Sequence, residues 1–312
     1  MRTVLVTGGA GFIGSHLVAA LVARGDRVRV LDDFSTGRIE NLAGLLDRIE
    51  LIRGTLLDPA VVVTAMRGAE CVFHEAALAS VPASVENPLV SHAACATGTL
   101  IVLDAARRLR VRRVVFAASS AAYGNQPAPV KRETDLPEAL SPYAAAKLAC
   151  EYYCAAFYHT YGLETVALRY FNVFGPRQDP AGPYAAVIPI FIQRMLAGQP
   201  PRILGDGLQT RDFCYVGNVV DANLRAADAP NAAGRTINVG SGAAIDLRTL
   251  VTHLNAALGT RLEPEFAPPR AGDVRDSRAD ITLARELLGY EPAIDLRAGI
   301  EQTVEFFRRG AT

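Results

Sequence analysis

The fold of this 312-residue chain is decided by its residues 7–14, Thr7-Gly8-Gly9-Ala10-Gly11-Phe12-Ile13-Gly14. This stretch follows a short apolar strand pattern, residues 4–7, and opens a helical pattern over 11–24 that stops at Gly25. Glycines at 8, 11 and 14 permit a tight turn, a close approach of backbone N–H groups to a pyrophosphate, and close packing of the helix on the strand. The helix N-terminus adds a positive dipole. The stretch therefore predicts a phosphate-binding strand–turn–helix unit.

A second strand is predicted over 27–31, and it ends at Asp32. A carboxylate at this place would accept hydrogen bonds from the adenosine ribose and repel a 2′-phosphate, which favours NAD over NADP. Asp58 stands where an adenine contact could lie, although a surface turn would also explain it. These positions extend the predicted nucleotide site beyond the glycines.

Strand and helix patterns alternate through the first half of the chain, and this alternation favours a parallel sheet covered on both faces. The predicted fold is α/β, a Rossmann-type doubly wound parallel sheet with a smaller α/β C-terminal substrate-binding domain. We expect residues 1–175 to form the NAD-binding domain, segments around 213–245 to return to it, and 176–312 to be mainly substrate-binding. Further strands are predicted over 71–74, 114–118, 165–169 and 236–239, helices over 97–110 and 141–161, and mixed segments over 262–266 and 281–288.

Composition excludes several classes of protein. Half of the residues are apolar, and 32 basic side chains balance 32 acidic ones, so neither disorder nor a general polyanion surface for nucleic acid or membrane is expected. No targeting segment is predicted, and no apolar run approaches about 18 residues. The five cysteines lack metal-site spacing, which favours buried thiols in a reducing cytoplasm and no metal.

A catalytic pair is predicted on the helix over 141–161. Tyr143 and Lys147 lie four residues apart and therefore share one face. A tyrosine is a weak base by itself, but a neighbouring ammonium favours its phenolate, so the pair makes a general base. Ser119 and Ser120 end the strand over 114–118, at the sheet edge where open parallel sheets bind ligands. We expect Ser119, Tyr143 and Lys147 to be catalytic.

These features together resemble the extended short-chain dehydrogenases/reductases, in the NAD-dependent epimerase/dehydratase family and its UDP-GlcNAc and UDP-glucose 4-epimerases. The resemblance covers essentially the whole chain and implies a bound NAD and a nucleotide-sugar substrate. The matching motifs are 7–14, Ala-Ala-Ser-Ser-Ala-Ala-Tyr-Gly (117–124), Ser-Pro-Tyr-Ala-Ala-Ala-Lys (141–147), Arg-Tyr-Phe-Asn-Val-Phe-Gly-Pro (169–176), Gly-Asp-Gly-Leu-Gln-Thr-Arg-Asp-Phe (205–213) and Arg-Ala-Gly-Asp-Val-Arg (270–275).

The resemblance also implies two sets of binding residues. Around NAD it implies Gly8, Gly11, Phe12, Ile13, Gly14, Asp32, Asp33, Gly37, Leu57, Asp58, Ala76, Ala77, Ala79, Tyr143, Lys147, Tyr170 and Val173. Around the UDP-sugar it implies Ser80, Ser119, Ser120, Ala121, Tyr143, Asn172, Ala186, Val187, Arg211, Arg270, Asp273 and Ser277. Two positions depart from the family pattern, Cys95 in place of an Asn and Thr55 in place of an Asp.

The residues directly after Ser119 narrow the implied reaction. The 4,6-dehydratases carry Asp-Glu there and the sugar-acid decarboxylases usually a Glu nearby, whereas this chain has Ser120 and Ala121. The reaction that remains is 4-epimerisation through transient oxidation of C4. Tyr143 would take the proton of the C4 hydroxyl with help from Ser119, hydride would pass to NAD, and the 4-keto sugar would turn and take hydride back on its other face.

The resemblance points to a broad substrate range. In the 4-epimerases the position of Ser277 lines the pocket near the C2 substituent, and a bulky aromatic residue there restricts it to neutral sugars. The small Ser277 leaves room for an N-acetyl group, so UDP-GlcNAc/UDP-GalNAc and UDP-glucose/UDP-galactose are both expected as substrates. Arginines such as Arg211 suit the diphosphate.

Three alternatives stay open. A UDP-glucuronate 4-epimerase, or another nucleotide-sugar epimerase, would need a cation for the carboxylate, for which Arg177 and Arg275 are candidates. A non-catalytic NAD-binding protein on this fold typically loses the Tyr/Lys pair, which this chain retains.

The resemblance also implies a homodimer, in which helices around 97–110 and 144–161 pack between subunits. A monomer's core would give the same apolar pattern.

Overall fold

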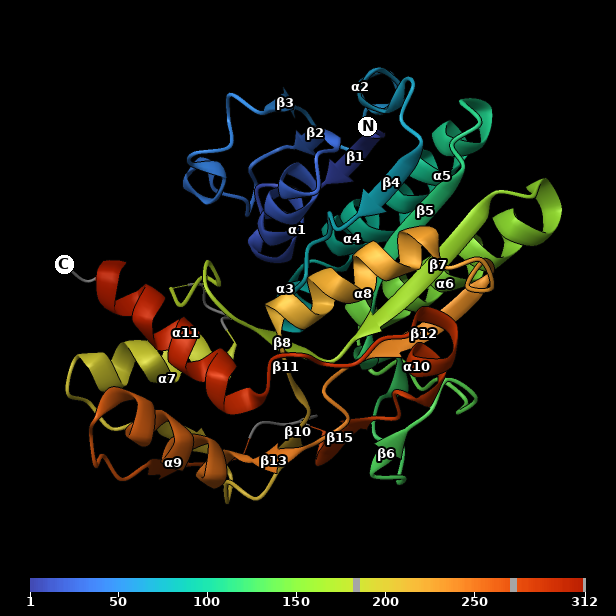
Figure 1. The fold of residues 1–312 in the computed structure, drawn as a ribbon. Coiled ribbons are helices and arrows are strands. Elements are labelled where there is room, and N and C mark those ends of the chain that lie inside the picture. The colour runs from blue at the N-terminus through green and yellow to red at the C-terminus, as the bar shows by residue number, and fades with distance from the viewer. Residues whose placement is uncertain (182–185, 270–273, 311–312) are drawn as a thin grey trace.

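The computed structural model describes residues 1–181, 186–269 and 274–310. Its centre is a seven-stranded sheet in the order β12-β7-β5-β4-β1-β2-β3, in which every pair of neighbours is parallel (Figure 1). The α/β, doubly wound fold class is thereby confirmed. The strands are β1 (Thr3–Thr7), β2 (Arg27–Asp32), β3 (Ile49–Arg53), β4 (Cys71–His74), β5 (Arg113–Ser119), β7 (Glu164–Tyr170) and β12 (Arg235–Val239).

Helices cover both faces of this sheet, and a buried apolar cluster lies under each layer. In β1, Val4 and Val6 join one cluster and Leu5 the other, because successive side chains of a strand point to opposite faces. Strands that are buried on both faces need continuous apolar runs, and such runs can be recognised in the sequence. One face carries α1 (Phe12–Ala23), α8 (Val216–Asp228) and α10 (Thr282–Leu288), and the other α2 (Pro59–Met66), α5 (Gly98–Arg108) and α6 (Pro142–Tyr161).

A smaller lobe is reached through β8 (Asn172–Phe174) and β11 (Phe213–Tyr215), which pair in parallel just beyond the end of β7 (Figure 1). It has its own apolar core, contributed largely by three helices, α7 (Val187–Leu196), α9 (Leu247–Leu258) and α11 (Leu296–Gly310). Its remaining strands are β9 (Arg202–Leu204) with β14 (Glu265–Ala267), and β13 (Ile245–Asp246), β10 (Thr210–Arg211), β15 (Asp276–Ala279) and β6 (Val130–Lys131) in that order.

The strands predicted over 4–7, 27–31, 71–74, 114–118, 165–169 and 236–239 are all present within one residue at either end. Among the elements that were not predicted are β3 and α2. Strand β3 lies at the edge of the sheet and carries charges, so its pattern is weaker. Of the mixed segments, 262–266 yields β14 from Glu265, and 281–288 yields α10 from Thr282.

The helix predicted over 97–110 is the end of a longer helical run. It begins with α4 (Pro88–His92), passes through a π-helical turn, η2 (Ala93–Thr97), and ends with α5. The run Pro88–Arg108 has 21 residues and a mean hydropathy of 1.5 in its most apolar window, half of which is buried. By length and composition this run could cross a membrane, but it includes the charged Asp104, and buried core helices also meet this criterion. The short elements still to be named are η1 (Ile39–Leu42), α3 (Val81–Glu86) and η3 (Ser120–Tyr123).

Candidate active site

A cavity of about 670 Å³ runs along the carboxyl ends of the sheet strands. The structure brings sixteen of the predicted residues to its wall: Gly8, Gly11, Phe12, Ile13, Gly14, Asp32, Asp33, Gly37, Leu57, Ala76, Ala77, Ala79, Ser80, Tyr143, Lys147 and Tyr170. Others do not reach that wall: Asp58, Ser119, Ser120, Ala121, Asn172, Val173, Ala186, Val187, Arg211 and Ser277. Arg270 and Asp273 lie outside the described residues.

The glycine loop fits a pyrophosphate. Gly8 has a left-handed φ of 69°, and a Cβ there would come within 2.7 Å of the Ala76 backbone. At Gly14 a Cβ would lie 2.1 Å from the Gly8 carbonyl oxygen. Helix α1 is capped by Gly11, which has no side chain to satisfy the first N–H groups. Since residues 11–14 line the cavity, these N–H groups offer an anion site there.

Asp32 connects the glycine loop to the end of β2. Its Oδ2 accepts a hydrogen bond from the Ala10 N–H at 2.8 Å, and its Oδ1 accepts one from the Phe34 N–H at 2.9 Å. Burial raises the pKa of this carboxyl, and the two N–H donors oppose that change. A Cβ at Gly37 would lie 2.8 Å from Oδ1, so only glycine leaves this oxygen accessible. The arrangement is suited to ribose hydroxyls.

Asp58 begins helix α2 beside the cavity. Its Oδ1 accepts hydrogen bonds from the N–H groups of Ala60 and Val61, at 2.9 and 3.4 Å, and thereby caps helix α2. Its neighbours Thr55 and Leu57 line the cavity, but Asp58 does not. The sequence Asp58-Pro59 is a helix start, with an acidic cap and proline in the first turn, and this signal could have been read.

Tyr143 and Lys147 both face the cavity from the first turns of α6. The Lys147 ammonium is buried, donates to the Ala117 carbonyl oxygen at 2.7 Å, and lies 4.8 Å from the centre of the Phe116 ring. Burial acts to lower the pKa of Lys147, but Tyr143 and other neighbouring groups outweigh it, and the net pKa is raised. The cation is therefore held beside the phenol.

Ser119 ends β5, in register with Tyr170 on β7. Its Oγ accepts a hydrogen bond from the Ala121 N–H at 3.2 Å and caps the short helix η3. The cavity wall reaches Ala117 and Ala118 on the same strand but stops before Ser119. Ser119 therefore stands beyond the wall formed by β5.

A buried hydrogen-bond chain ties the strands beneath the glycine loop to helix α5. The two ring nitrogens of His74 lie 2.7 Å from Thr7 Oγ1 and 2.9 Å from Thr99 Oγ1. Burial lowers the pKa of His74 to about 3, so the ring is neutral and can donate at one nitrogen while accepting at the other. Thr99 in turn donates to the carbonyl of Cys95, in the π-helical turn beside the cavity, at 2.6 Å.

Four charged residues of the wall, Arg38, Glu75, Arg177 and Asp179, were missed as cofactor-site candidates. Glu75 follows directly after β4, just as Asp32 and Ser119 end their strands, and this shared position is the signal that could have found it. Arg177 was considered only as a partner for a substrate carboxylate. It is half-buried and has a left-handed φ of 65°, and burial lowers the pKa of its guanidinium.

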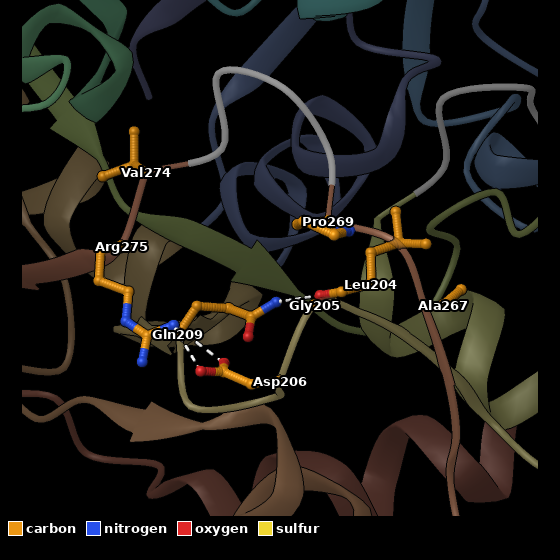
Figure 2. A pocket seen from close by; sticks show the side chains of 8 residues that line it. All are labelled: Leu204, Gly205, Asp206, Gln209, Ala267, Pro269, Val274 and Arg275. Carbon is orange, nitrogen blue, oxygen red and sulfur yellow. Dashed lines mark hydrogen bonds and ion pairs between the residues drawn. The ribbon is translucent and has the colours of Figure 1, made fainter.

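A second cavity, of about 630 Å³, lies in the smaller lobe between β9 and the segment before β15 (Figure 2). Arg275 lines it and pairs with Asp206, with Nη1–Oδ1 at 2.9 Å. Arg211 and Ser277 are register partners on β10 and β15, and Arg211 donates to the Arg275 carbonyl at 3.3 Å. Asn172 contacts Asp212, the residue that follows Arg211: the Asn172 backbone N–H donates to the Asp212 carbonyl at 3.1 Å. Asn172, Arg211 and Ser277 thus lie on connected strands where the two lobes join.

No group of three or more His, Cys, Asp or Glu side chains that could hold a metal ion occurs among residues 1–181, 186–269 and 274–310. The cysteines at 71, 95, 150, 154 and 214 are buried free thiols. The site chemistry open to these residues is therefore that of the glycine loop, the carboxylates and the tyrosine–lysine pair.

A parallel sheet whose first strand ends in a glycine loop, with a tyrosine and a buried lysine across the same cavity, defines an NAD-binding short-chain dehydrogenase/reductase. The sequence profile of the NAD dependent epimerase/dehydratase family matches residues 4–240, and the chain belongs to that family. NAD is its cofactor, in agreement with the glycine loop and Asp32.

Three similar proteins cover nearly the whole chain. A UDP-glucose 4-epimerase of Mycolicibacterium smegmatis is 45% identical over 99% of both chains. The structure of a UDP-N-acetylglucosamine 4-epimerase from Methanobrevibacter ruminantium in complex with UDP-N-acetylmuramic acid is 38% identical, with a TM-score of 0.95 over 99% of both chains. The structure of a Thermus thermophilus UDP-glucose 4-epimerase with NAD is 39% identical, with a TM-score of 0.90 over all of both chains.

Proposed function

We propose that the protein is a UDP-sugar 4-epimerase that interconverts UDP-GlcNAc with UDP-GalNAc and UDP-glucose with UDP-galactose. The observation that carries the proposal is the placement of Tyr143 and the buried Lys147 in the same cavity as the glycine loop. The similar proteins support the reaction class. The NAD site is assigned to residues 1–175 with the returning segments around 213–245, and the UDP-sugar site mainly to 176–312.

Bound NAD supplies a reversible acceptor and donor of hydride. Tyr143 takes the proton of the C4 hydroxyl and returns it after the sugar has turned over. Lys147 supplies a fixed positive charge on the same cavity wall, where its ammonium donates to the Ala117 carbonyl oxygen. Ser119 ends strand β5 just beyond the cavity wall, and its role in orienting the reacting oxygen is assigned from the resemblance. Chain residues therefore control both the proton and the position of C4.

The nucleotide part of the substrate is assigned to the junction of the lobes. Arg211, Asn172 and Ser277 lie there on joined strands, and guanidinium groups match phosphate oxygens through paired donors. Arg270, Asp273, Ala186 and Val187 are assigned to the same site by the resemblance. Assays with UDP-glucose and UDP-GlcNAc test the proposal, and no epimerisation of either sugar by NAD-loaded protein would refute it.

Substrate breadth is predicted to depend on Ser277. We expect Ser277→Tyr to lower turnover of UDP-GlcNAc roughly tenfold or more, because the ring takes the space of the N-acetyl group. Turnover of UDP-galactose should change only a few-fold. Both are measured as kcat/KM, with Ser277→Ala as the control that keeps the space open. Equal losses on both sugars would contradict this assignment of Ser277.

The runner-up is a UDP-glucuronate 4-epimerase, which needs a cation beside C6. The two candidate arginines lie at different cavities: Arg177 lines the one with Tyr143, and Arg275 lines the one in the smaller lobe and is paired with Asp206. A panel of UDP-glucose, UDP-GlcNAc and UDP-glucuronate separates the two functions. Preference for UDP-glucuronate over both other sugars would favour the runner-up.

A homodimer is proposed from an exposed apolar surface on α4 and α6. Leu89 is 83% exposed and Tyr152 62% exposed, and the helices that carry them contact each other. Charge on such a surface opposes association. We expect Leu89→Asp to convert a dimer into a monomer of about 33.3 kDa in light scattering. Leu136→Asp is the control, at a residue that is 81% exposed and lies outside this surface. An unchanged mass for Leu89→Asp would refute the surface.

A cytoplasmic location is also proposed, because all five cysteine thiols are unpaired.

A further inference from the structure

Glu75 is a charged residue of the cavity wall that the proposed proton transfer does not use. Its backbone N–H donates to the Thr7 carbonyl at 3.2 Å, which fixes it directly beside the glycine loop. Its side chain lines the cavity together with Tyr143, Lys147 and Tyr170. An acid is therefore placed in the wall between the phosphate end and the catalytic end of one cavity.

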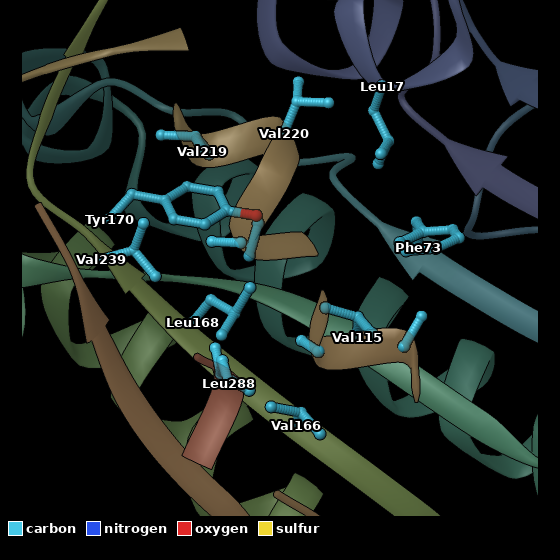
Figure 3. Packing of buried hydrophobic residues seen from close by; sticks show 14 of the residues in the cluster. Leu17, Phe73, Val115, Val166, Leu168, Tyr170, Val219, Val220, Val239 and Leu288 are labelled. Carbon is cyan, nitrogen blue, oxygen red and sulfur yellow. The ribbon is translucent and has the colours of Figure 1, made fainter. Parts of the chain in front are cut away.

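A chain of hydrogen bonds fixes the Glu75 carboxyl as an acceptor. Asn223 on α8 donates from Nδ2 to the Tyr170 hydroxyl at 2.7 Å, and that hydroxyl donates its own proton to Glu75 Oε1 at 2.9 Å. The Tyr170 ring packs near the apolar side chains of Val219 and Val239, which hold the hydroxyl in place (Figure 3). The ordered donor suits a carboxylate better than a neutral acid.

The groups that surround Glu75 place the pKa of its carboxyl near neutral pH. Burial raises the pKa of Glu75 to about 7, against the Tyr170 hydrogen bond and the positive field of Lys147, which both lower it. Tyr143 on α6 and Tyr170 on β7 are the phenols of the same wall, and burial holds the pKa of Tyr170 well above its usual range. On its own strand, His74 is neutral because burial lowers its pKa. Behind Tyr170, burial raises the pKa of the Cys214 thiol to about 12, so it too is neutral.

We propose that Glu75 sets the balance between oxidised and reduced NAD in this protein. The proposal rests on the placement of NAD in the cavity that Glu75 lines. The oxidised nicotinamide ring carries a positive charge and the reduced ring does not, so a nearby carboxylate stabilises only the oxidised form. Lys147 acts in the opposite direction from the same wall, and Glu75 offsets it. The resting protein is thereby kept with oxidised cofactor, ready for the first half of the reaction.

The sign of the pH dependence follows from the raised pKa. Above about pH 7 the Glu75 side chain is ionised and favours oxidised NAD, and below it the neutral acid gives up this preference. The ratio of the dissociation constant of NADH to that of NAD⁺ should therefore rise with pH. At an effective dielectric constant of about 20, a tenfold change in this ratio corresponds to one charge about 12 Å from the ring.

The experiment measures both dissociation constants on purified protein between pH 6 and 8.5, by NADH fluorescence and by displacement of NADH with NAD⁺. Glu75→Gln keeps the shape and an acceptor for Tyr170 but cannot ionise. We expect its ratio to be roughly tenfold below wild type at high pH and flat across the range. The proposal would be overturned if the ratio of the two dissociation constants in Glu75→Gln equalled the wild-type value and still rose with pH.

Two further variants keep the test independent of how Glu75→Gln folds. Tyr170→Phe keeps the carboxylate but removes a hydrogen bond that lowers its pKa, so the midpoint of the pH dependence should move upward; an unmoved midpoint counts against the proposal. Glu133→Gln removes another acid whose pKa burial raises, outside the cavity wall, and should leave ratio and midpoint unchanged. A change in Glu133→Gln equal to that in Glu75→Gln would also overturn it.

The placement of NAD is tested separately with Gly11→Leu. A Cβ at Gly11 meets only the Gly8 carbonyl oxygen within 4 Å, so the larger side chain can enter the cavity without disturbing the core. Both nucleotides should be lost if this cavity holds NAD. Retention of both by Gly11→Leu would refute the placement of NAD, and with it this proposal, whereas a failure in Glu75→Gln alone would leave the placement intact.

Discussion

Tyr143→Phe is expected to lower the turnover of UDP-sugar epimerisation by roughly 10²- to 10⁴-fold, the usual contribution of a positioned acid–base group. The substitution removes the one oxygen that can take the C4 proton. It leaves the helix start intact, because the Tyr143 backbone N–H still donates to Ser84 Oγ at 3.1 Å. Turnover is measured with UDP-galactose, and UDP binding is measured by calorimetry on the same preparation.

The matched control for this loss is Tyr152→Phe, which removes the same oxygen from the exposed side of the same helix. It should keep wild-type turnover. UDP should bind to Tyr143→Phe within a few-fold of wild type, since the nucleotide is assigned to the other lobe. Wild-type turnover in Tyr143→Phe would show that the base has been wrongly assigned.

Gly14→Ala is expected to destabilise the protein strongly and to weaken NAD binding. The added Cβ would lie 2.1 Å from the Gly8 carbonyl oxygen and 2.9 Å from the Gly9 Cα, all of it backbone that cannot rotate away. Helix α1 must then separate from the glycine loop. We expect a loss of about 2 to 4 kcal/mol in the free energy of unfolding and a loss of NAD affinity of roughly tenfold or more, because the loop N–H groups are displaced.

Denaturant unfolding of the NAD-free protein gives the stability change, and NAD titration gives the affinity. Gly310→Ala is the control, since a Cβ at that helical glycine meets nothing within 4 Å. It should leave stability and affinity within error of wild type. If Gly14→Ala kept both values as well, the close packing of α1 on the loop would have no energetic consequence.

The sheet could be predicted because its strands are buried on both faces. Such strands must be continuous apolar runs, as in β4 (Cys71–His74), and these are visible without an alignment. The edge strand β3 is covered less and carries Glu50 and Arg53, so no such run marks it. The membrane-length helix through Pro88–Arg108 was likewise missed, because its π-helical turn continues the helix across a segment with no clear apolar period.

The residues of the candidate site also differ in how far the sequence could predict them. Tyr143 and Lys147 could be paired from sequence because a helix brings every fourth residue to one face. The cap that Asp58 forms on helix α2 was missed although it is local, since its carboxylate accepts from the N–H groups of Ala60 and Val61 and Pro59 follows it. The hydrogen bond between Glu75 and Tyr170 joins residues 95 positions apart, and no local pattern reports it.

Sequence patterns therefore sufficed for the fold class, the glycine loop and the tyrosine–lysine pair, because short-range spacing dictates each of them. Tertiary structure alone decided which polar side chains share the cavity and with what charge. It placed Arg177 and Arg275 at separate cavities and buried Glu75 beside Lys147. Burial and the partners supplied by distant segments set these properties, and both exist only once the chain has folded.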